Sequence, residues 1–337
     1  MCLPRDLAAL AVAGALLAAC GEGREGAETP EREPRPGPKA AQGEGGGPEG
    51  GQGAIRAAIR NVHLRVDEAV VLEIRGLTGT LESTRPGEVP FFDDAESFRI
   101  RIEGAEVAMS PESLAGLLNR YVFAYEGAPL SDLTVELTED GRVRQSGTLA
   151  KAGGIPISMT GKLSPTPDGD VQLEPDEMSA AGVPVERLLD LFGVELSDLI
   201  NTREELGVRI EEDTIILDPE RAVPPPRIVG RVSAVRVEGG RIVQVFGDGP
   251  ADSPRPPVAD RGHLFFLGGV LRFGKLTMRP ADLEIADLDP SDPFEFYQRR
   301  YQEQLVAGYS KTLEDDGLVS FMPDYPEAAG GDHRPRQ

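Results

Sequence analysis

Cysteine and tryptophan are scarce in this chain. Among 337 residues there are two cysteines, Cys2 and Cys20, no tryptophan, and only 5% aromatic side chains. Two cysteines near the start cannot support a framework of several disulfides or a cysteine-rich metal site in the rest of the chain. The scarcity of aromatic rings also argues against a cleft that binds sugars by stacking.

The familiar catalytic motifs are missing as well. The three histidines, His63, His263 and His333, stand apart from one another, and no H-E-x-x-H, G-x-S-x-G or P-loop pattern occurs. Two pairs of adjacent carboxylates, Asp93-Asp94 and Glu211-Glu212, lie in polar stretches, where solvated turns are a commoner role than glycoside cleavage. We therefore expect a binding protein that is not an enzyme and uses no cofactor.

Positive charge is under-represented, and long apolar runs are lacking. The chain has 35 basic and 57 acidic residues, which gives a net charge of −22. Such a charge disfavours binding to nucleic acid and to anionic membrane surfaces. A membrane-spanning helix needs about 20 apolar residues in a row, and the segment Leu7–Leu17 is too short. We expect neither a nucleic-acid partner nor a spanning helix.

The first twenty residues follow the pattern of a secretory signal peptide. The apolar segment Leu7–Leu17 is followed by small residues, as in a signal peptide. The sequence LAAC at residues 17–20 resembles the lipobox of bacterial lipoproteins, which implies cleavage before Cys20 and acylation of that residue, with palmitate among the chains. Residues 1–19 would leave together with Cys2, so no thiol would remain for a disulfide. The alternatives are an ordinary signal peptide and a short buried helix.

The residues after Cys20 predict in which membrane the protein is anchored and how far its folded part extends from that membrane. Gly21, rather than aspartate, resembles the sorting signal for the outer membrane, so we expect anchoring there with the protein facing the periplasm. Residues 20–54 consist mostly of glycine, proline and glutamate without an apolar period, which predicts a disordered tether. A flexible chain of this length has a reach of roughly 30 to 35 Å. The folded part could therefore work away from its anchor.

Strand patterns dominate residues 55–250. The apolar side chains Phe98, Ile100 and Ile102 alternate with charged ones, as expected for a strand with one buried face. Similar runs are separated by short sequences that favour β-hairpin turns, namely Asp140-Gly141, Asp168-Gly169 and Gly239-Gly240. The pattern predicts long antiparallel strands whose apolar face needs a cover.

Two short helices are predicted to cover this face. The first has Ser110 as its N-cap and Pro111 in its first turn, and the second begins at Pro184. Each carries an apolar stripe at helical spacing. If the helices fill the space only in part, six of their side chains would border a cavity, namely Leu114, Leu117, Leu118, Leu188, Leu189 and Phe192. If they fill it completely, the same side chains form a solid core.

Residues 251–325 are predicted to form an extension of strands followed by a helix. The helix would begin after the N-cap Asp292, with Pro293 in its first turn and Glu295 completing a capping box. Its apolar face would hold Phe294, Tyr297, Tyr301 and Leu305. The aspartates 287, 289 and 292 are spaced like the start of a calcium loop, but the central glycine and the distal glutamate are absent, so we expect no metal. Residues 326–337 are expected to be a flexible tail.

The order of these elements resembles a known family. A strand that ends in the helix SPESLAGLLNRYVF, followed by the hairpins LTVELTEDGRVRQSGTLAKAGGIPISMTGKL, is similar to the small bacterial members of the TULIP-like lipid-binding group, such as the LmeA-like proteins. The resemblance covers about residues 60–245. It implies an α+β fold in which a long curved antiparallel β-sheet is wrapped around one or two amphipathic helices and leaves an apolar tunnel for acyl chains.

Two functions follow as expectations. In the first, the chain is a membrane-anchored envelope lipoprotein that binds or carries a lipid or other apolar ligand in a sheet-and-helix cavity. In the second, it is a non-enzymatic structural or interaction lipoprotein with a solid core and an acidic docking surface. They differ in whether the inner faces of the strands enclose space.

Overall fold

The structure is a computed structural model, and it describes residues 53–150, 154–184, 202–211, 213–254, 256–258 and 260–330. All of these belong to one compact unit, Gly50–Gln337. The predicted signal peptide, Cys20, nearly all of the predicted tether and the predicted second helix lie outside the described residues, as do Leu188, Leu189 and Phe192.

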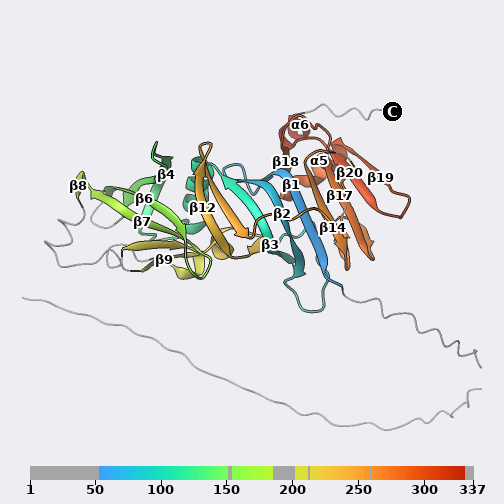
Figure 1. Ribbon diagram of the computed structural model, residues 1–337, viewed down its shortest axis with the longest axis horizontal. Helices are drawn as coiled ribbons and strands as arrows, with labels where there is room; N and C mark the ends of the chain where they lie inside the picture. The colour runs from blue at the N-terminus through green and yellow to red at the C-terminus, as the bar shows by residue number, and fades with distance from the viewer. Residues whose placement is uncertain are drawn as a thin grey trace, which may run out of the picture. The chain divides into compact units, whose positions relative to one another are not determined.

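Most described residues belong to β-strands, and the larger sheet runs from the middle of this unit to one end of it (Figure 1). Its strands are, in spatial order, β12 (Val232–Glu238), β13 (Arg241–Gly247), β3 (Phe98–Met109), β2 (Val71–Ser83), β1 (Ile55–Arg65), β14 (His263–Gly268), β17 (Ala281–Asp287), β20 (Leu318–Met322) and β19 (Tyr309–Thr312). Two further strands pair parallel with this path, β11 (Arg227–Val229) with β3 and β18 (Phe294–Tyr297) with β1. The C-terminal strands therefore extend the same sheet that begins with β1.

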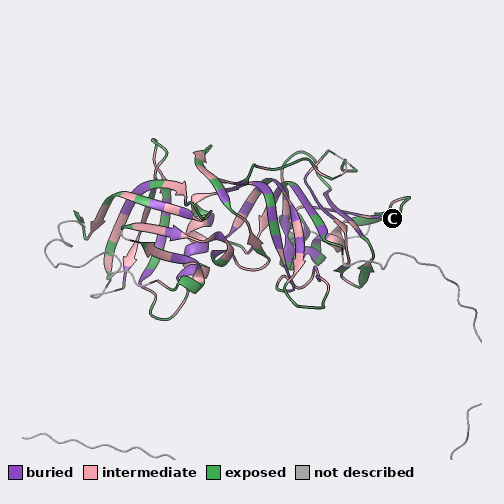
Figure 2. Ribbon diagram, turned by 60° about the horizontal axis from the view of Figure 1, so that its bottom comes forward, coloured by how far each residue is buried: buried purple, intermediate pink, exposed green. Residues whose placement is uncertain are grey.

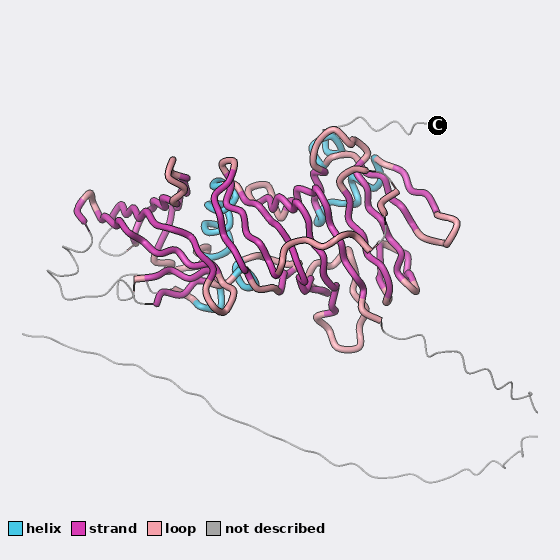
Figure 3. The backbone as a smooth tube through the Cα atoms, in the orientation of Figure 1, coloured by secondary structure: helices cyan, strands magenta, loops and turns pink. Residues whose placement is uncertain are grey.

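A second sheet uses the middle of the chain. Its strands are, in spatial order, β4 (Leu130–Leu137), β5 (Val143–Leu149), β6 (Ile155–Pro165), β7 (Val171–Ala180), β10 (Thr214–Leu217) and β9 (Val208–Glu211), with β8 (Val183–Pro184) paired to β7. A small separate hairpin joins β15 (Leu271–Phe273) and β16 (Leu276–Met278). The tube in Figure 3 shows both sheets as curled rather than flat. The fold is therefore a sheet-dominated α+β fold, as predicted.

The predicted hairpins are confirmed. Strands β4 and β5, β6 and β7, and β12 and β13 are antiparallel neighbours, joined at the three predicted turns. In the last turn Gly239 and Gly240 both have positive φ, 57° and 74°, which is the backbone that a two-residue hairpin turn requires. The alternation predicted for β3 is also confirmed, because Phe98, Ile100 and Ile102 are buried while their neighbours lie nearer to solvent. Figure 2 shows that buried segments occur along the strands of both sheets.

Two glycines allow the sheets to bend where the pairing register shifts. The register between β2 and β3 changes at Thr78/Gly79, and the register between β6 and β7 changes at Thr160/Gly161. A Cβ atom on Gly79 or on Gly161 would lie 2.2 Å from a backbone oxygen of the neighbouring strand. Only glycine permits this approach, and such irregularities increase the local bend and twist of a strand.

The helix at the start of the second sheet forms as predicted. α1 (Pro111–Leu117) has Ser110 as its N-cap, whose hydroxyl accepts a hydrogen bond from the Ser113 amide at 3.1 Å. It continues directly as a π-helix, η1 (Leu118–Val122). The Asn119 amide then joins this turn to β4, donating to the Leu133 carbonyl at 2.7 Å and accepting from the Leu133 amide at 2.9 Å. The helix is thereby fixed to the second sheet.

The helix predicted to begin after Asp292 is wrong in its first half. Residues Phe294–Tyr297 form β18, which pairs parallel with Val62–Arg65 of β1. A short 3-10 turn, η4 (Gln298–Arg300), follows, and only then does the helix α5 (Tyr301–Ala307) begin. Phe294 and Phe296 are both fully buried, so the period of two and the pairing with β1 outweigh the local helix signals.

The remaining helical segments are short. They are η3 (Glu204–Leu206), α4 (Pro219–Ala222) and α6 (Tyr325–Gly330). α6 occupies the start of the stretch predicted to be a tail, and its residues contact α5. No helix among the described residues is long and apolar enough to cross a membrane.

Candidate functional site

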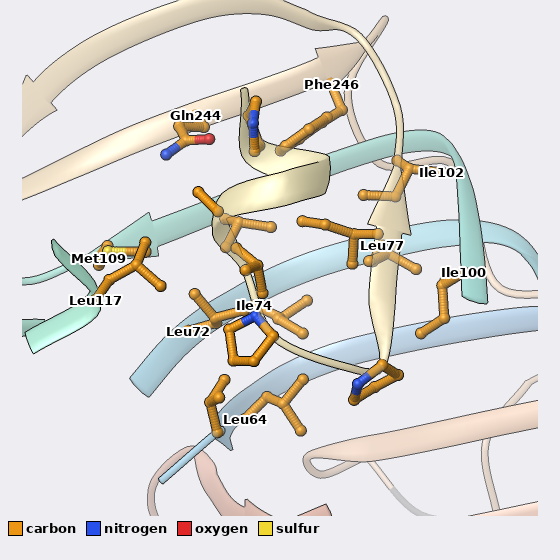
Figure 4. A pocket seen from close by; sticks show the side chains of 18 of the residues that line it. Leu64, Leu72, Ile74, Leu77, Ile100, Ile102, Met109, Leu117, Gln244 and Phe246 are labelled. Atoms are coloured by element: carbon orange, nitrogen blue, oxygen red, sulfur yellow. The ribbon is translucent and has the colours of Figure 1, made fainter. Parts of the chain in front are cut away.

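A first apolar cavity lies under the inner face of the larger sheet. Its free volume is about 50 Å³. The side chains around it come from β1, β2, β3 and β13, with α1 and the segment 217–228 closing the other side (Figure 4). Among the described residues that line it, Gln244 is the single polar one; the apolar lining includes Leu72, Ile74, Leu77, Ile102, Met109 and Phe246.

A second apolar cavity lies under the inner face of the second sheet. Its free volume is about 70 Å³. Side chains of β4 to β7, β9 and β10 line it together with Leu118 of η1. Its described lining contains three polar residues, Gln145, Thr202 and Gln244, and no charged one.

The two cavities are neighbours. Leu114, Leu217 and Gln244 line both of them, and none of these three side chains is fully buried. They come from α1, β10 and β13, elements that belong to the helix and to both sheets. The cavities therefore meet at one junction, where the helix lies between the sheets.

Gln244 occupies an apolar position of β13. On that strand Ile242, Gln244 and Phe246 point to the same face, and the first and last of them are buried. Gln244 pairs with Val235 on one side and with Val107 on the other. In the part of the chain that the structure describes, its side-chain amide makes no hydrogen bond, and neither does that of Gln145. Both glutamines are half-buried, so each amide keeps donors and an acceptor that a bound molecule could use.

The structure brings together the three predicted cavity residues that it describes. Leu114 lines both cavities, Leu117 lines the first and Leu118 lines the second. Leu117 and Leu118 are 2% and 7% exposed, so both are integral to the packing. The sequence interpretation did not identify Gln145 or Gln244. The signal for Gln244 was available, because a glutamine interrupts the alternation between Ile242 and Phe246.

Polar contacts hold the helix in place beside the cavities. The Tyr121 hydroxyl donates to Asp67 at 2.7 Å, and Asp67 also accepts from the Ala69 and Val70 amides. Burial alone would raise the pKa of Asp67, but these hydrogen bonds and nearby Arg120 outweigh it and lower that pKa. Burial and the neighbouring Asp67 raise the pKa of Tyr121 to about 12. At neutral pH the pair is therefore a phenol bound to a carboxylate.

Two groups of ionisable side chains lie outside the cavities and close to β18. Glu295 accepts from His63 at 2.7 Å and from Arg65 at 3.1 Å. This hydrogen bond raises the pKa of His63, and it helps to lower the pKa of Glu295 against the opposing effect of burial. Burial raises the pKa of Asp287 to about 7 and that of Asp324 to about 6. No group of three or more His, Cys, Asp or Glu side chains within the described ranges is arranged to hold a metal ion.

Comparison with protein-family models, with curated proteins and with solved structures found no match for this chain.

Proposed function

We propose that this chain binds or carries a lipid or other apolar ligand in its two adjacent cavities. The observation that carries the proposal is their lining, which is aliphatic and aromatic except for a few uncharged polar groups. In this proposal the two curled sheets together form a long curved and mainly antiparallel surface around an amphipathic helix, α1 with η1. Apolar pockets with a few polar groups are the usual form of small-molecule sites.

The free space also has an energetic consequence. Residual cavities in protein cores cost roughly 24 cal/mol per Å³, so cavities of about 50 and 70 Å³ cost roughly 3 kcal/mol together. An apolar ligand that fills them restores the missing dispersion contacts. An engineered apolar cavity of about 150 Å³ binds benzene; both cavities are smaller than this, so an acyl chain must displace side chains or part the two sheets. Leu114, half-buried at the junction, is the side chain best placed to move.

The N-terminal residues indicate where in the cell this binding would occur. The lipobox-like sequence before Cys20 and the polar stretch after it favour a lipoprotein anchored in the bacterial envelope, with the outer membrane facing the periplasm as the proposed location. An acyl anchor and a flexible tether would keep the cavities near the source of their ligand. The proposed role is transport or storage of the ligand without catalysis.

The anchor is tested with Cys20→Ser. We expect this variant to move from the detergent phase to the aqueous phase in a phase-partition experiment, because the acyl chains are lost. Cys2→Ser is the matched control, since Cys2 would leave with the signal peptide. Unchanged partitioning of Cys20→Ser would contradict lipid anchoring at this residue.

The cavity is tested with a version of the chain that begins at Gly21. Organic extraction and mass spectrometry of the purified protein should find an apolar ligand near one per chain. Leu114→Trp should reduce this load several-fold while unfolding stays cooperative, because the larger side chain fills the junction. Leu276→Trp is the control, since Leu276 is 52% exposed and outside both described linings. An empty extract together with no binding of added lipid would favour the alternative, an interaction lipoprotein with an acidic docking surface.

A further inference from the structure

We infer that the ligand of the two cavities is an uncharged ester lipid with two apolar chains, one in each cavity, whose ester region is bound by Gln244. The inference rests on the proposed function and adds the chemical class of the ligand. It follows from three observations, namely where the two cavities meet, which polar groups they offer, and which charges they lack.

The position of Gln244 sets the position of the ligand's polar group. Gln244 lines both cavities, together with Leu114 and Leu217. A polar group bound to its amide therefore has apolar space on two sides. A single-chain fatty acid, with its carboxylate at one end, can use only one side. A lipid with a chain on each side of its polar group can use both.

The chemistry of Gln244 sets the kind of polar group. A side-chain amide donates two hydrogen bonds and accepts others, and this amide makes none among the described residues. The NH₂ group can donate to an ester carbonyl, and the carbonyl oxygen can accept from a free hydroxyl. Gln145, which is half-buried and lines the second cavity only, has a side-chain amide with the same donors and acceptor.

The described linings favour an uncharged group at this point. Neither described lining contains a Lys, Arg, His, Asp or Glu side chain. In a phospholipid the phosphate is attached beside the ester groups, so binding the esters at Gln244 would bring an unpaired anion into an apolar site. Such a transfer costs far more than that of a neutral group. The neutral lipid is therefore the better fit.

The experiment compares three probes on the delipidated chain that begins at Gly21. The probes are dioleoylglycerol, dioleoylphosphatidylglycerol, which has the same chains and a charged phosphate, and squalane, which is an apolar chain without a polar group. We expect dioleoylglycerol to bind at least about tenfold more tightly than either of the others, the size expected for a buried hydrogen bond and for a desolvated charge.

The variant Gln244→Leu sharpens the test. It should weaken dioleoylglycerol binding about tenfold and leave squalane binding unchanged or stronger. The apolar replacement lies between Ile242 and Phe246, so we expect the fold to persist, which circular dichroism and urea unfolding check. Gln172→Leu is the matched control, because Gln172 bonds to Ser164 and Glu174 and lies outside both described linings.

Equal binding of the phospholipid and the diacylglycerol, or an unchanged diacylglycerol affinity in Gln244→Leu, would overturn the assignment of the ligand class. The proposed lipid-binding function would stand in both cases. If none of the three probes binds, both the ligand class and the proposed function are contradicted.

Discussion

Around β14, β17 and β18 aromatic rings pack against one another, whereas around β2, β3 and β13 most inward side chains are aliphatic. The ring of Phe92 lies 5.4 Å from that of Phe266, 5.4 Å from Phe273 and 5.1 Å from Tyr301, centroid to centroid. None of these four residues belongs to the described lining of either cavity. Large rings fill the space at one end of the sheet, while branched aliphatic chains curled around one short helix leave space at the other.

This difference separates two roles within one sheet. Aromatic pairs add dispersion and quadrupole contacts beyond their buried area, so the aromatic end favours a single rigid packing. At the aliphatic end the empty space lowers the stability of the fold, and a ligand that fills this space restores the lost contacts. We expect the aromatic end to contribute most of the stability and the aliphatic end to bind the ligand.

The largest expected effect is at the aromatic end. Phe92→Ala removes a ring that contacts several others, and the substitution should lower the free energy of unfolding by about 3–5 kcal/mol. Urea unfolding followed by circular dichroism measures the change. A loss below about 1 kcal/mol would mean that this end is not the rigid part of the unit.

The next effect concerns pH. The fully buried Asp287 has a pKa raised to about 7 by burial, so the folded state keeps a proton there that the unfolded state loses at lower pH. Stability should therefore fall as the pH rises from about 4 to 7, with a contribution on the order of 1–3 kcal/mol. Asp287→Asn should flatten this profile and be the more stable protein at pH 8.

The control for this prediction is Asp289→Asn. Asp289 is exposed, and its pKa is lowered, not raised, by hydrogen bonds from Ser291. The control should keep the fall in stability between about pH 4 and pH 7. In Asp287→Asn the free energy of unfolding should still fall slightly with rising pH, because the pKa of Asp324 is raised as well. An unchanged profile in Asp287→Asn would show that this carboxyl ionises without cost in the folded protein.

The smallest effect compares one added methylene at the two ends. Val62, fully buried beside Phe294 on β18, lies outside both described linings, whereas Val143 lines the second cavity. Val62→Ile should lower the free energy of unfolding by about 1–2 kcal/mol, because a filled core resists overpacking. Val143→Ile should be neutral or stabilising by up to about 1 kcal/mol, as cavity filling is. Equal losses at both positions would remove the distinction between the two ends.

The hairpins show where local sequence is sufficient. In β4 and β5 the alternation around Leu133 and Val135 and the turn at Asp140-Gly141 are all local signals, and they agree with one another. The same holds for the cap at Ser110 and the stripe of Leu114, Leu117 and Leu118. Those elements form as predicted because period, turn and cap point to the same structure.

The segment after Asp292 shows where local signals conflict. Aspartate, proline and glutamate there resemble a helix start, yet Phe294 and Phe296 also fit a strand of period two. β1 supplies a backbone edge for parallel pairing and a core that takes both rings. Neither could be known from the segment itself, because β1 lies some 230 residues earlier in the chain.

The sequence by itself determined the hairpins, their turns, the first helix and which of its side chains face inward, because these depend on neighbours a few residues apart. Only the tertiary structure decided that the C-terminal strands extend the sheet of β1, that aromatic rings fill one end of it, and that two cavities meet at Gln244. Those features depend on the combined volume and polarity of side chains from distant strands. The spacing of residues along the chain does not contain this information.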